Sequence, residues 1–228
     1  APETLPEPTS EGIDLSFEYK ADKPKSTIAL VGGTVVTMRD ADNKQEIIEN
    51  GVVLVEGNRI AAVGKQGEVN IPSDAKIQDV SGHTLVPGLI DAHAHGSQGS
   101  NQIIPQQNWK NFSSIGFGVT TLHDPSNDNR EIFAAAEMQK AGKILGPRIF
   151  STGKILYAGY HPGYTAKIDG IDDARFHIER TKENGAVSVK SYNHPRRDTR
   201  HQVLAAAREL GVNVVPEGGG KLYQNMTM

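Results

Sequence analysis

Two histidines separated by a single alanine form the strongest chemical signal in the sequence. His93 and His95 follow an apolar run that begins at Val86, and Asp91 precedes them. In a β-strand, residues two apart face the same side, so Asp91, His93 and His95 are expected to point one way. Two imidazoles on one face at a strand end make a ready pair of nitrogen ligands for zinc or a similar divalent metal. The alternative for this spacing is a pair of structural histidines.

The pattern of expected secondary structure around this histidine pair changes near residue 86. Residues 1–25 are polar and rich in Pro and Glu, which is typical of a linker or a loosely attached arm. Residues 26–85 contain short β patterns broken by turn residues, with a hairpin turn expected at residues 56–59. We interpret this segment as a small antiparallel β unit. Residues 86–228 then alternate between strand and helix patterns.

This alternation predicts strands at 89–93, 119–123, 148–151, 187–190 and 212–215, and helices near 105–115, 130–142, 172–184 and 197–210. Gly142, Gly185 and Gly211 each stand between a helix and a strand, as C-terminal caps do. Repeated βα units imply a parallel sheet, either in a (β/α) barrel or in an open doubly wound sheet. No Gly-x-Gly-x-x-Gly follows the first strand. The Gly218-Gly219-Gly220 run keeps an open-sheet nucleotide-binding protein as an alternative.

Composition excludes several function classes. The 228 residues carry a net charge of −3, so nucleic acid and anionic membrane surfaces are not expected partners. No apolar run approaches the roughly 18 residues of a membrane span, and no signal peptide is visible. The chain has no cysteine, which excludes disulfides and cysteine-based zinc sites. We therefore expect a soluble protein, cytoplasmic or periplasmic/secreted, with the compartment left undecided.

The residues around the histidine pair resemble a known family. Residues 87–95, Pro-Gly-Leu-Ile-Asp-Ala-His-Ala-His, look like the first-strand signature of the amidohydrolase superfamily. Residues 48–60 and 79–86 resemble the small β-sandwich domain that precedes the barrel in that family. The resemblance runs from about residue 26 to the end of the chain. It is strongest to the imidazolonepropionase-like branch, which includes members fused behind a β-propeller, although no propeller repeat is present here.

The resemblance implies a (β/α)8-type, TIM-like barrel preceded by a small β-sandwich unit, with one or two divalent metals, zinc above all. Lys190 matches a lysine that can be carboxylated and bridge two metals in the family. Because Ser188 and Lys190 alternate with Val187 and Val189, Lys190 is expected inside the barrel, where an unpaired cation is costly. Glu217 stands where the family usually supplies a histidine, and a carboxylate can also ligate zinc; the alternative is a residue at the barrel rim.

Further site residues are expected at strand ends and in one loop. His123 ends the second strand and is a candidate catalytic residue. Asp124 and Asp91 are candidates for supporting the ligand histidines from outside the coordination sphere. His161, in a long loop after the third strand, is a candidate for catalysis and for substrate binding, as the resemblance implies. Tyr192, which follows Lys190 by two residues, is a second candidate for contacting substrate.

The family pattern also predicts what this chain lacks. A full barrel needs roughly 250 residues, more than follow residue 86, so only about five of the strands are expected and the chain is read as truncated. The strand-eight aspartate, the family's general base, is not in it. The predicted function is hydrolysis of an amide or other C–N bond of a small molecule by a metal-activated water. The alternative is a non-catalytic scaffold or inactive fragment that works by assembly, with a homo-oligomer or a complementing chain as partner.

Overall fold

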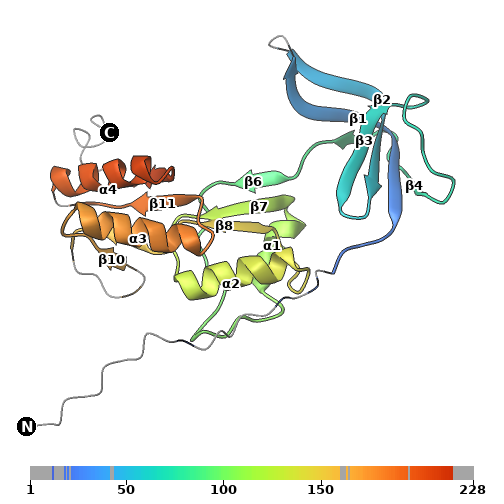
Figure 1. Cartoon of the computed structure of the whole chain (residues 1–228). Coiled ribbons are helices and arrows are strands. Elements are labelled where there is room, and N and C mark those ends of the chain that lie inside the picture. Colours follow the sequence, from blue (N-terminus) through green and yellow to red (C-terminus); the bar gives the residue numbers. More distant parts are fainter. Residues whose placement is uncertain are drawn as a thin grey trace, which may run out of the picture.

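The computed structural model describes residues 22–41, 44–159, 163, 165–194 and 196–217, with the isolated positions 12, 18 and 20. An N-terminal sheet lies at one end of an elongated molecule, and a mixed α/β region forms the rest (Figure 1). Most of the expected arm, residues 1–25, lies outside the described residues. Its residue Asp22 donates its backbone N–H to the carbonyl of Ala141, 2.8 Å away, so this part of the arm contacts the α/β region.

The N-terminal sheet contains five strands, β1 (Thr27–Ala41), β2 (Lys44–Glu56), β3 (Arg59–Lys65), β4 (Lys76–Asp79) and β5 (Thr84–Leu85). Their order is β3-β2-β1-β4, and β5 also pairs with β1. The predicted hairpin joins β2 to β3, with Gly57 at a φ of 59° in the turn. The core of the sheet is apolar and consists of Ala29, Val35, Val52, Val53 and Leu54.

Two details of this sheet differ from the expectation. The predicted strands on either side of Gly32-Gly33 are one strand, β1, because these glycines lie at shifts in the pairing with β2 and do not break it. The unit is also not wholly antiparallel, since β4 and β5 pair with β1 in parallel. This happens because the chain crosses from the β3 edge to the far side of β1. The described strands form one sheet, so the two-layered sandwich stays a prediction.

The described residues of the α/β region form seven strands and four helices. They are β6 (Leu89–Asp91), α1 (Trp109–Gly116), β7 (Val119–Asp124), α2 (Asn129–Lys140), β8 (Arg148–Ser151), β9 (Ile155–Tyr157), β10 (Thr165–Lys167), α3 (Ile171–Glu183), β11 (Ser188–Ser191), α4 (Arg197–Glu209) and β12 (Asn213–Pro216). The five strands and four helices predicted from the sequence are all present, most within two residues of their expected bounds, although α1 begins later. Strands β9 and β10 were not predicted, because each is only three residues long.

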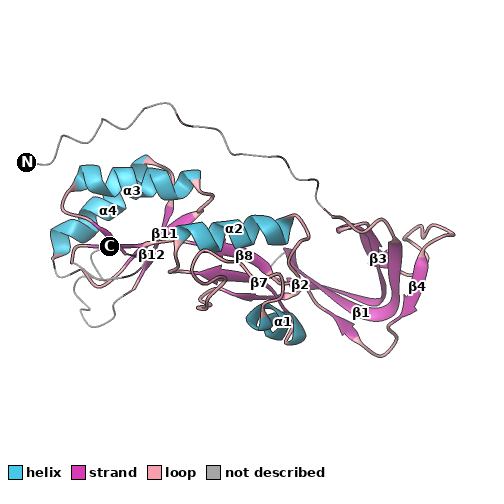
Figure 2. Ribbon diagram, turned by 90° about the horizontal axis from the view of Figure 1, so that it is seen from below, coloured by secondary structure: helices cyan, strands magenta, loops and turns pink. Residues whose placement is uncertain are grey.

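These strands form two parallel sheets, ordered β6-β7-β8 and β10-β9-β11-β12. Helices α3 and α4 pack on the second sheet around Val189, Ile178 and Val203, all fully buried. Helix α2 packs on the first sheet through Ile132 and Ala135. Figure 2 shows α2 and α3 above the strands and α1 on the opposite side of β7 and β8. No closed barrel is formed by the part of the chain that the structure describes.

Helix ends follow the sequence signals. Asn108 and Asp128 accept hydrogen bonds from the backbone N–H groups of Lys110 and Arg130, which caps α1 and α2 at their N-termini. Gly142, Gly185 and Gly211 have φ values of 78°, 100° and 64° after α2, α3 and α4, which confirms the predicted caps. These caps fix the short connections that lead from each helix to the strand after it.

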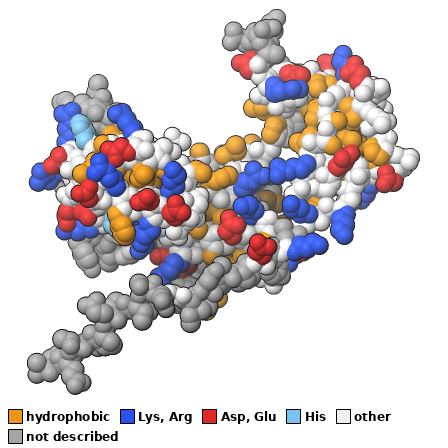
Figure 3. Space-filling model, in the orientation of Figure 1, with side chains coloured by type: hydrophobic (Ala, Val, Ile, Leu, Met, Phe, Trp, Pro, Cys, Tyr) orange, Lys and Arg blue, Asp and Glu red, His pale blue; other side chains and the backbone are white. Residues whose placement is uncertain are grey.

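Several apolar side chains remain on the surface of both regions. In the N-terminal sheet, Ile60 is 67% exposed and Met38 is 64% exposed, and Figure 3 shows apolar atoms on this end of the molecule. On the edge strand β6, Ile90 is 69% exposed. Among the described residues, no helix is both long enough and apolar enough to cross a lipid bilayer.

Candidate metal centre

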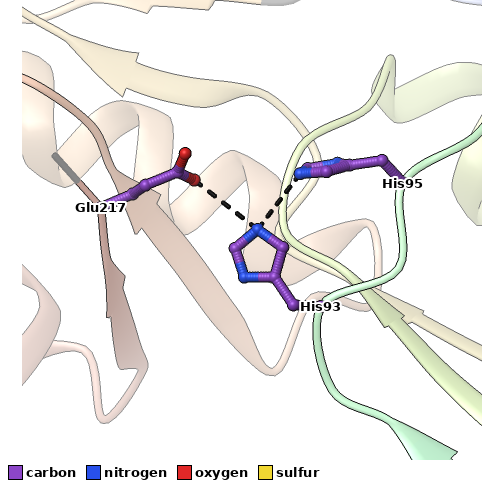
Figure 4. Close-up of side chains that lie close together, drawn as sticks. All are labelled: His93, His95 and Glu217. Carbon is purple, nitrogen blue, oxygen red and sulfur yellow. Dashed lines mark hydrogen bonds and ion pairs between the residues drawn. The ribbon is translucent and has the colours of Figure 1, made fainter. Parts of the chain in front are cut away.

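The histidine pair lies just beyond the end of a strand. Strand β6 stops at Asp91, so the expectation that 91, 93 and 95 alternate within one strand is wrong in detail. The backbone turns because a carboxylate oxygen of Asp91 accepts the N–H of His93 at 3.1 Å. The two rings nevertheless converge: their Nε2 atoms are 3.1 Å apart, and the rings meet edge to face (Figure 4). Asp91 thus shapes the turn and makes no described bond to an imidazole ring.

Glu217 reaches the same point from the second sheet. It directly follows β12, and its backbone N–H donates to the carbonyl of Ser191 at 3.0 Å, which continues the β11–β12 pairing. One carboxylate oxygen lies 3.7 Å from Nε2 of His93 (Figure 4). The ligand atoms of His93, His95 and Glu217 all lie within 4.8 Å of one another. Two imidazole nitrogens and a carboxylate oxygen at this spacing form a donor set that suits a divalent cation.

Lys190 points into the same site from β11. Its side chain is 2% exposed, and its Nζ forms an ion pair with the Glu217 carboxylate oxygen that faces His93. Val189, on the opposite face of the strand, is fully buried against the helices, as the alternation predicts. Val187 is instead 53% exposed, because β11 begins only at Ser188. A nearly buried lysine whose cation meets a carboxylate is electrostatically satisfied in this arrangement.

Asp124 holds His95 from behind. The carboxylate is buried at the end of β7, and its Oδ1 lies 3.3 Å from Nδ1 of His95. The same oxygen accepts the backbone N–H of Ser126, and Oδ2 accepts a bond from the amide of Asn127 at 2.8 Å. With Nδ1 directed at Asp124, Nε2 of His95 is left to face His93. This carboxylate–histidine pairing is common behind metal ligands, where it fixes the ring orientation.

His123 bridges the two parallel sheets. Its Nε2 lies 2.8 Å from the hydroxyl of Ser188 on β11, and the ring also bonds the backbone of Ala92. Burial is the main cause that lowers the pKa of His123 below its usual value. The ring is therefore engaged with protein groups of both segments. The imidazole connects the histidine-bearing segment to the strand that carries Lys190, so its predicted catalytic role would require one of these bonds to open.

The two expected substrate contacts differ in what the structure describes. His161 lies outside the described residues. Tyr192 is half-buried, and its ring lies 5.3 Å from Nζ of Lys190 and 6.1 Å from the ring of Tyr157. The Gly218-Gly219-Gly220 run of the nucleotide-binding alternative also falls outside the described residues.

Several residues of the site were not predicted. Ser126 and Asn127 are buried and hydrogen-bonded to Asp124, and the short polar run after a strand end was the available signal. Arg200 is buried beneath the ends of β11 and β12, which no local pattern indicates. His194, by contrast, is a weaker candidate that the sequence offers in the loop after Lys190; it is buried, and neither ring nitrogen has a hydrogen-bond partner among the described residues. Burial, and then the charge of Arg200, lower the pKa of His194 to about 4.

Comparison with known proteins agrees with this geometry. The chain is 36% identical over 83 residues to an enamidase from Eubacterium barkeri, which covers 36% of this chain and 21% of that protein. It is 39% identical over 74 residues to an imidazolonepropionase from a Geobacillus species, 30% of this chain and 18% of that protein. A solved putative prolidase from Bifidobacterium longum superposes with a TM-score of 0.66 at 22% identity, over 85% of this chain and 49% of that one.

No family model matches the chain. The aligned segments span at most 21% of the two curated relatives, and the structural match spans 49% of the prolidase. The parallel strands followed by helices, with a convergent histidine pair beyond a strand end, define a mixed α/β fold that carries a candidate metal site. The chain is therefore similar to the enamidase and the imidazolonepropionase over part of their length, and it shares the fold of the prolidase.

Proposed function

We propose that this chain carries the metal centre of an amidohydrolase that cleaves an amide or other C–N bond in a small molecule. The observation that carries the proposal is the convergence of His93 and His95 with Glu217 and Lys190, which come from two different parallel sheets. Side chains far apart in sequence meet at one point at the strand ends, where barrel enzymes place their chemistry.

We further propose that the two parallel sheets are consecutive arcs of one (β/α)8-type barrel. The bond between His123 on β7 and Ser188 on β11 supports this, because it joins side chains of two sheets that share no strand pairing. In the proposed division, residues 1–25 are an arm, 26–85 a small β domain and 86–228 part of the barrel. A homo-oligomer or a complementing chain stays a prediction.

Zinc is the proposed ion, since two imidazoles and a carboxylate are ligands that it prefers. A bound divalent ion would lower the pKa of a water and polarise the substrate carbonyl. The protein's own part is to hold three donors at fixed positions: Asp124 orients His95, Asp91 shapes the turn that places His93, and the β11–β12 pairing places Glu217. Tyr192 and His161 are proposed to contact the substrate.

Lys190 competes with a cation for Glu217 while it remains an ammonium, because its Nζ occupies the carboxylate oxygen that faces His93. Carboxylation would remove this competition. In that step the neutral amine adds to carbon dioxide, one N–C bond forms and one proton is released, which gives an anionic carbamate. Lys190 would then supply ligand oxygens in place of a positive charge, and Glu217 would be released to bind the ion.

The decisive experiment measures metal and turnover together. We expect the purified chain to bind zinc, and His93→Ala to bind much less. Catalysis is measured with the longest natural form of the protein on N-acyl amino acids, dipeptides and cyclic amides, with the metal removed and then restored. Zinc binding without turnover would favour the non-catalytic scaffold. Absence of any zinc, manganese or iron together with protection by nucleotides would favour the open-sheet alternative.

A further inference from the structure

Arg200 lies in the first turn of α4 and is 1% exposed, although arginine is rarely buried so deeply. Its guanidinium group lies at the ends of β11 and β12, beside the backbone of the proposed ligand Glu217. One guanidinium nitrogen, Nη2, donates to two backbone carbonyls, that of Tyr192 at 3.0 Å and that of Glu217 at 2.8 Å. One side chain therefore ties the end of one strand to the end of its neighbour.

Both hydrogen bonds are made to backbone carbonyls. The carboxylate of Glu217 meets Lys190 and His93, whereas its carbonyl meets Arg200. The backbone N–H of Glu217 is bonded in turn to Ser191. Glu217 is thus fixed at its N–H by β11 and at its carbonyl by α4, so its side chain leaves from a backbone held on both sides.

We propose that Arg200 is a positioning residue that sets the metal affinity of the site by fixing the backbone of Glu217 and, through Tyr192, the segment after Lys190. The inference rests on the proposed function, since it requires Glu217 to be a ligand. Groups that orient a ligand from outside the coordination sphere change metal affinity about 10- to 100-fold when they are removed. Arg200 differs from Asp124 in acting on the main chain and not on the ligand atom.

The test compares zinc affinity in four single variants and one double variant of the full chain, by competition with a chromophoric chelator. Arg200→Met removes both hydrogen bonds to the backbone carbonyls while keeping much of the side-chain volume. Arg200→Lys keeps the positive charge on a shorter side chain. Arg208→Met is the matched control, because Arg208 is an exposed arginine in the last turn of the same helix. Glu217→Gln removes the proposed ligand charge.

We expect Arg200→Met to weaken zinc binding about 10- to 100-fold, Arg200→Lys to weaken it less, and Arg208→Met to leave it unchanged. Combining Arg200→Met with Glu217→Gln separates positioning from general damage. If Arg200 acts through Glu217, the double variant binds zinc as Glu217→Gln does. A loss of the same factor in both backgrounds would overturn the inference, and so would wild-type affinity in Arg200→Met.

Unfolding midpoints measured with chelator present show whether each variant is folded. If Arg200→Met does not fold, Arg200→Lys decides: we expect severalfold weaker zinc binding than wild type, and equal affinity overturns the inference. The proposed function fails separately. If the wild-type chain binds zinc no better than His93→Ala does, both claims are lost. If Glu217→Gln weakens binding and Arg200→Met does not, only the role of Arg200 is lost.

Discussion

The N-terminal sheet and the α/β region bury different kinds of side chain. In the sheet, the described buried side chains are apolar, with Val52 and Ala29 at its centre. In the α/β region, the buried side chains include a lysine, an arginine, a histidine and an aspartate, namely Lys190, Arg200, His194 and Asp124. Burying a charged or polar side chain costs free energy unless it meets a partner. A cluster of such buried groups therefore indicates a functional site.

This difference indicates that the two regions have different roles: the sheet contributes stability, and the α/β region carries the candidate metal site. The sheet stabilises itself by apolar packing and carries no described cluster of potential metal ligands. The α/β region places polar groups at the strand ends, where they hold one another and the convergent histidines. Substitutions in the two regions should therefore have separable effects, on metal binding in one and on stability alone in the other.

The largest effect on the site is expected from loss of a ligand. His95→Ala should weaken zinc binding by about two to three orders of magnitude, since a structural zinc site of four ligands contributes about 10 to 16 kcal/mol in total. The readout is metal content after dialysis and a titration against a competing chelator. His83→Ala is the matched control, because His83 is an exposed histidine in the N-terminal region. Equal losses in both variants would contradict the assignment of the site.

A smaller effect is expected from Asp124→Asn. The substitution keeps the size of the side chain but removes the charge that faces Nδ1 of His95, so zinc affinity should fall about 10- to 100-fold. Asp74→Asn, an exposed change in the N-terminal region, should have no effect. An Asp124→Asn protein that is folded and binds zinc at wild-type affinity would show that Asp124 only shapes the loop.

His194 predicts a dependence of stability on pH in the α/β region. Its folded-state pKa of about 4 lies below the usual 6.5, so the unfolded chain binds the extra proton more readily. Its contribution is fully present above about pH 6.5 and is lost as the pH falls toward 4. His194→Phe should therefore stabilise the chain relative to wild type by about 2 kcal/mol more at pH 5 than at pH 7.5.

This prediction is checked by urea unfolding at the two pH values, with His201→Phe as the exposed control in the same part of the chain. An equal effect of His194→Phe at both pH values would mean that the imidazole finds a hydrogen-bond partner or takes up a proton in the folded state. Either result would remove His194 from the list of costly buried groups.

The smallest effect on the site is expected from the sheet. Leu54→Ala should lower the free energy of unfolding by about 2 to 5 kcal/mol, because Leu54 is 4% exposed in the apolar core. Zinc affinity, measured well below the unfolding midpoint, should not change. A parallel loss of affinity would show that the N-terminal sheet and the metal centre are coupled, and the division drawn above would be wrong.

Most of the fold could be predicted because its signals are local. The βα rhythm, the glycines after α2, α3 and α4, and the β2–β3 turn all depend on residues near one another in sequence. The features that were not predicted depend on pairing between strands that are distant in sequence. The crossing that makes β4 parallel to β1 and the three-residue strands β9 and β10 are set by tertiary contacts, which no periodicity of a short segment records.

The site divides in the same way. His93 and His95 were predictable from their spacing and Lys190 from the alternation of β11. Their convergence depends on the loop after β6, which the strand-based expectation did not foresee. Glu217 was placed near the site by the resemblance alone. Arg200 carries no signal in its neighbours, because its burial depends on how α4 packs against the strand ends.

The bridge made by His123 has a thermodynamic consequence. The proposed ligands come from the segment after β6 and from the ends of β11 and β12. A bound ion would therefore connect two sheets that have no strand pairing with each other. Ligation would then add to the free energy of folding by mass action. With zinc in excess, the two sheets should unfold in a single cooperative transition on heating or in denaturant. With a chelator present, they should unfold in two separate transitions.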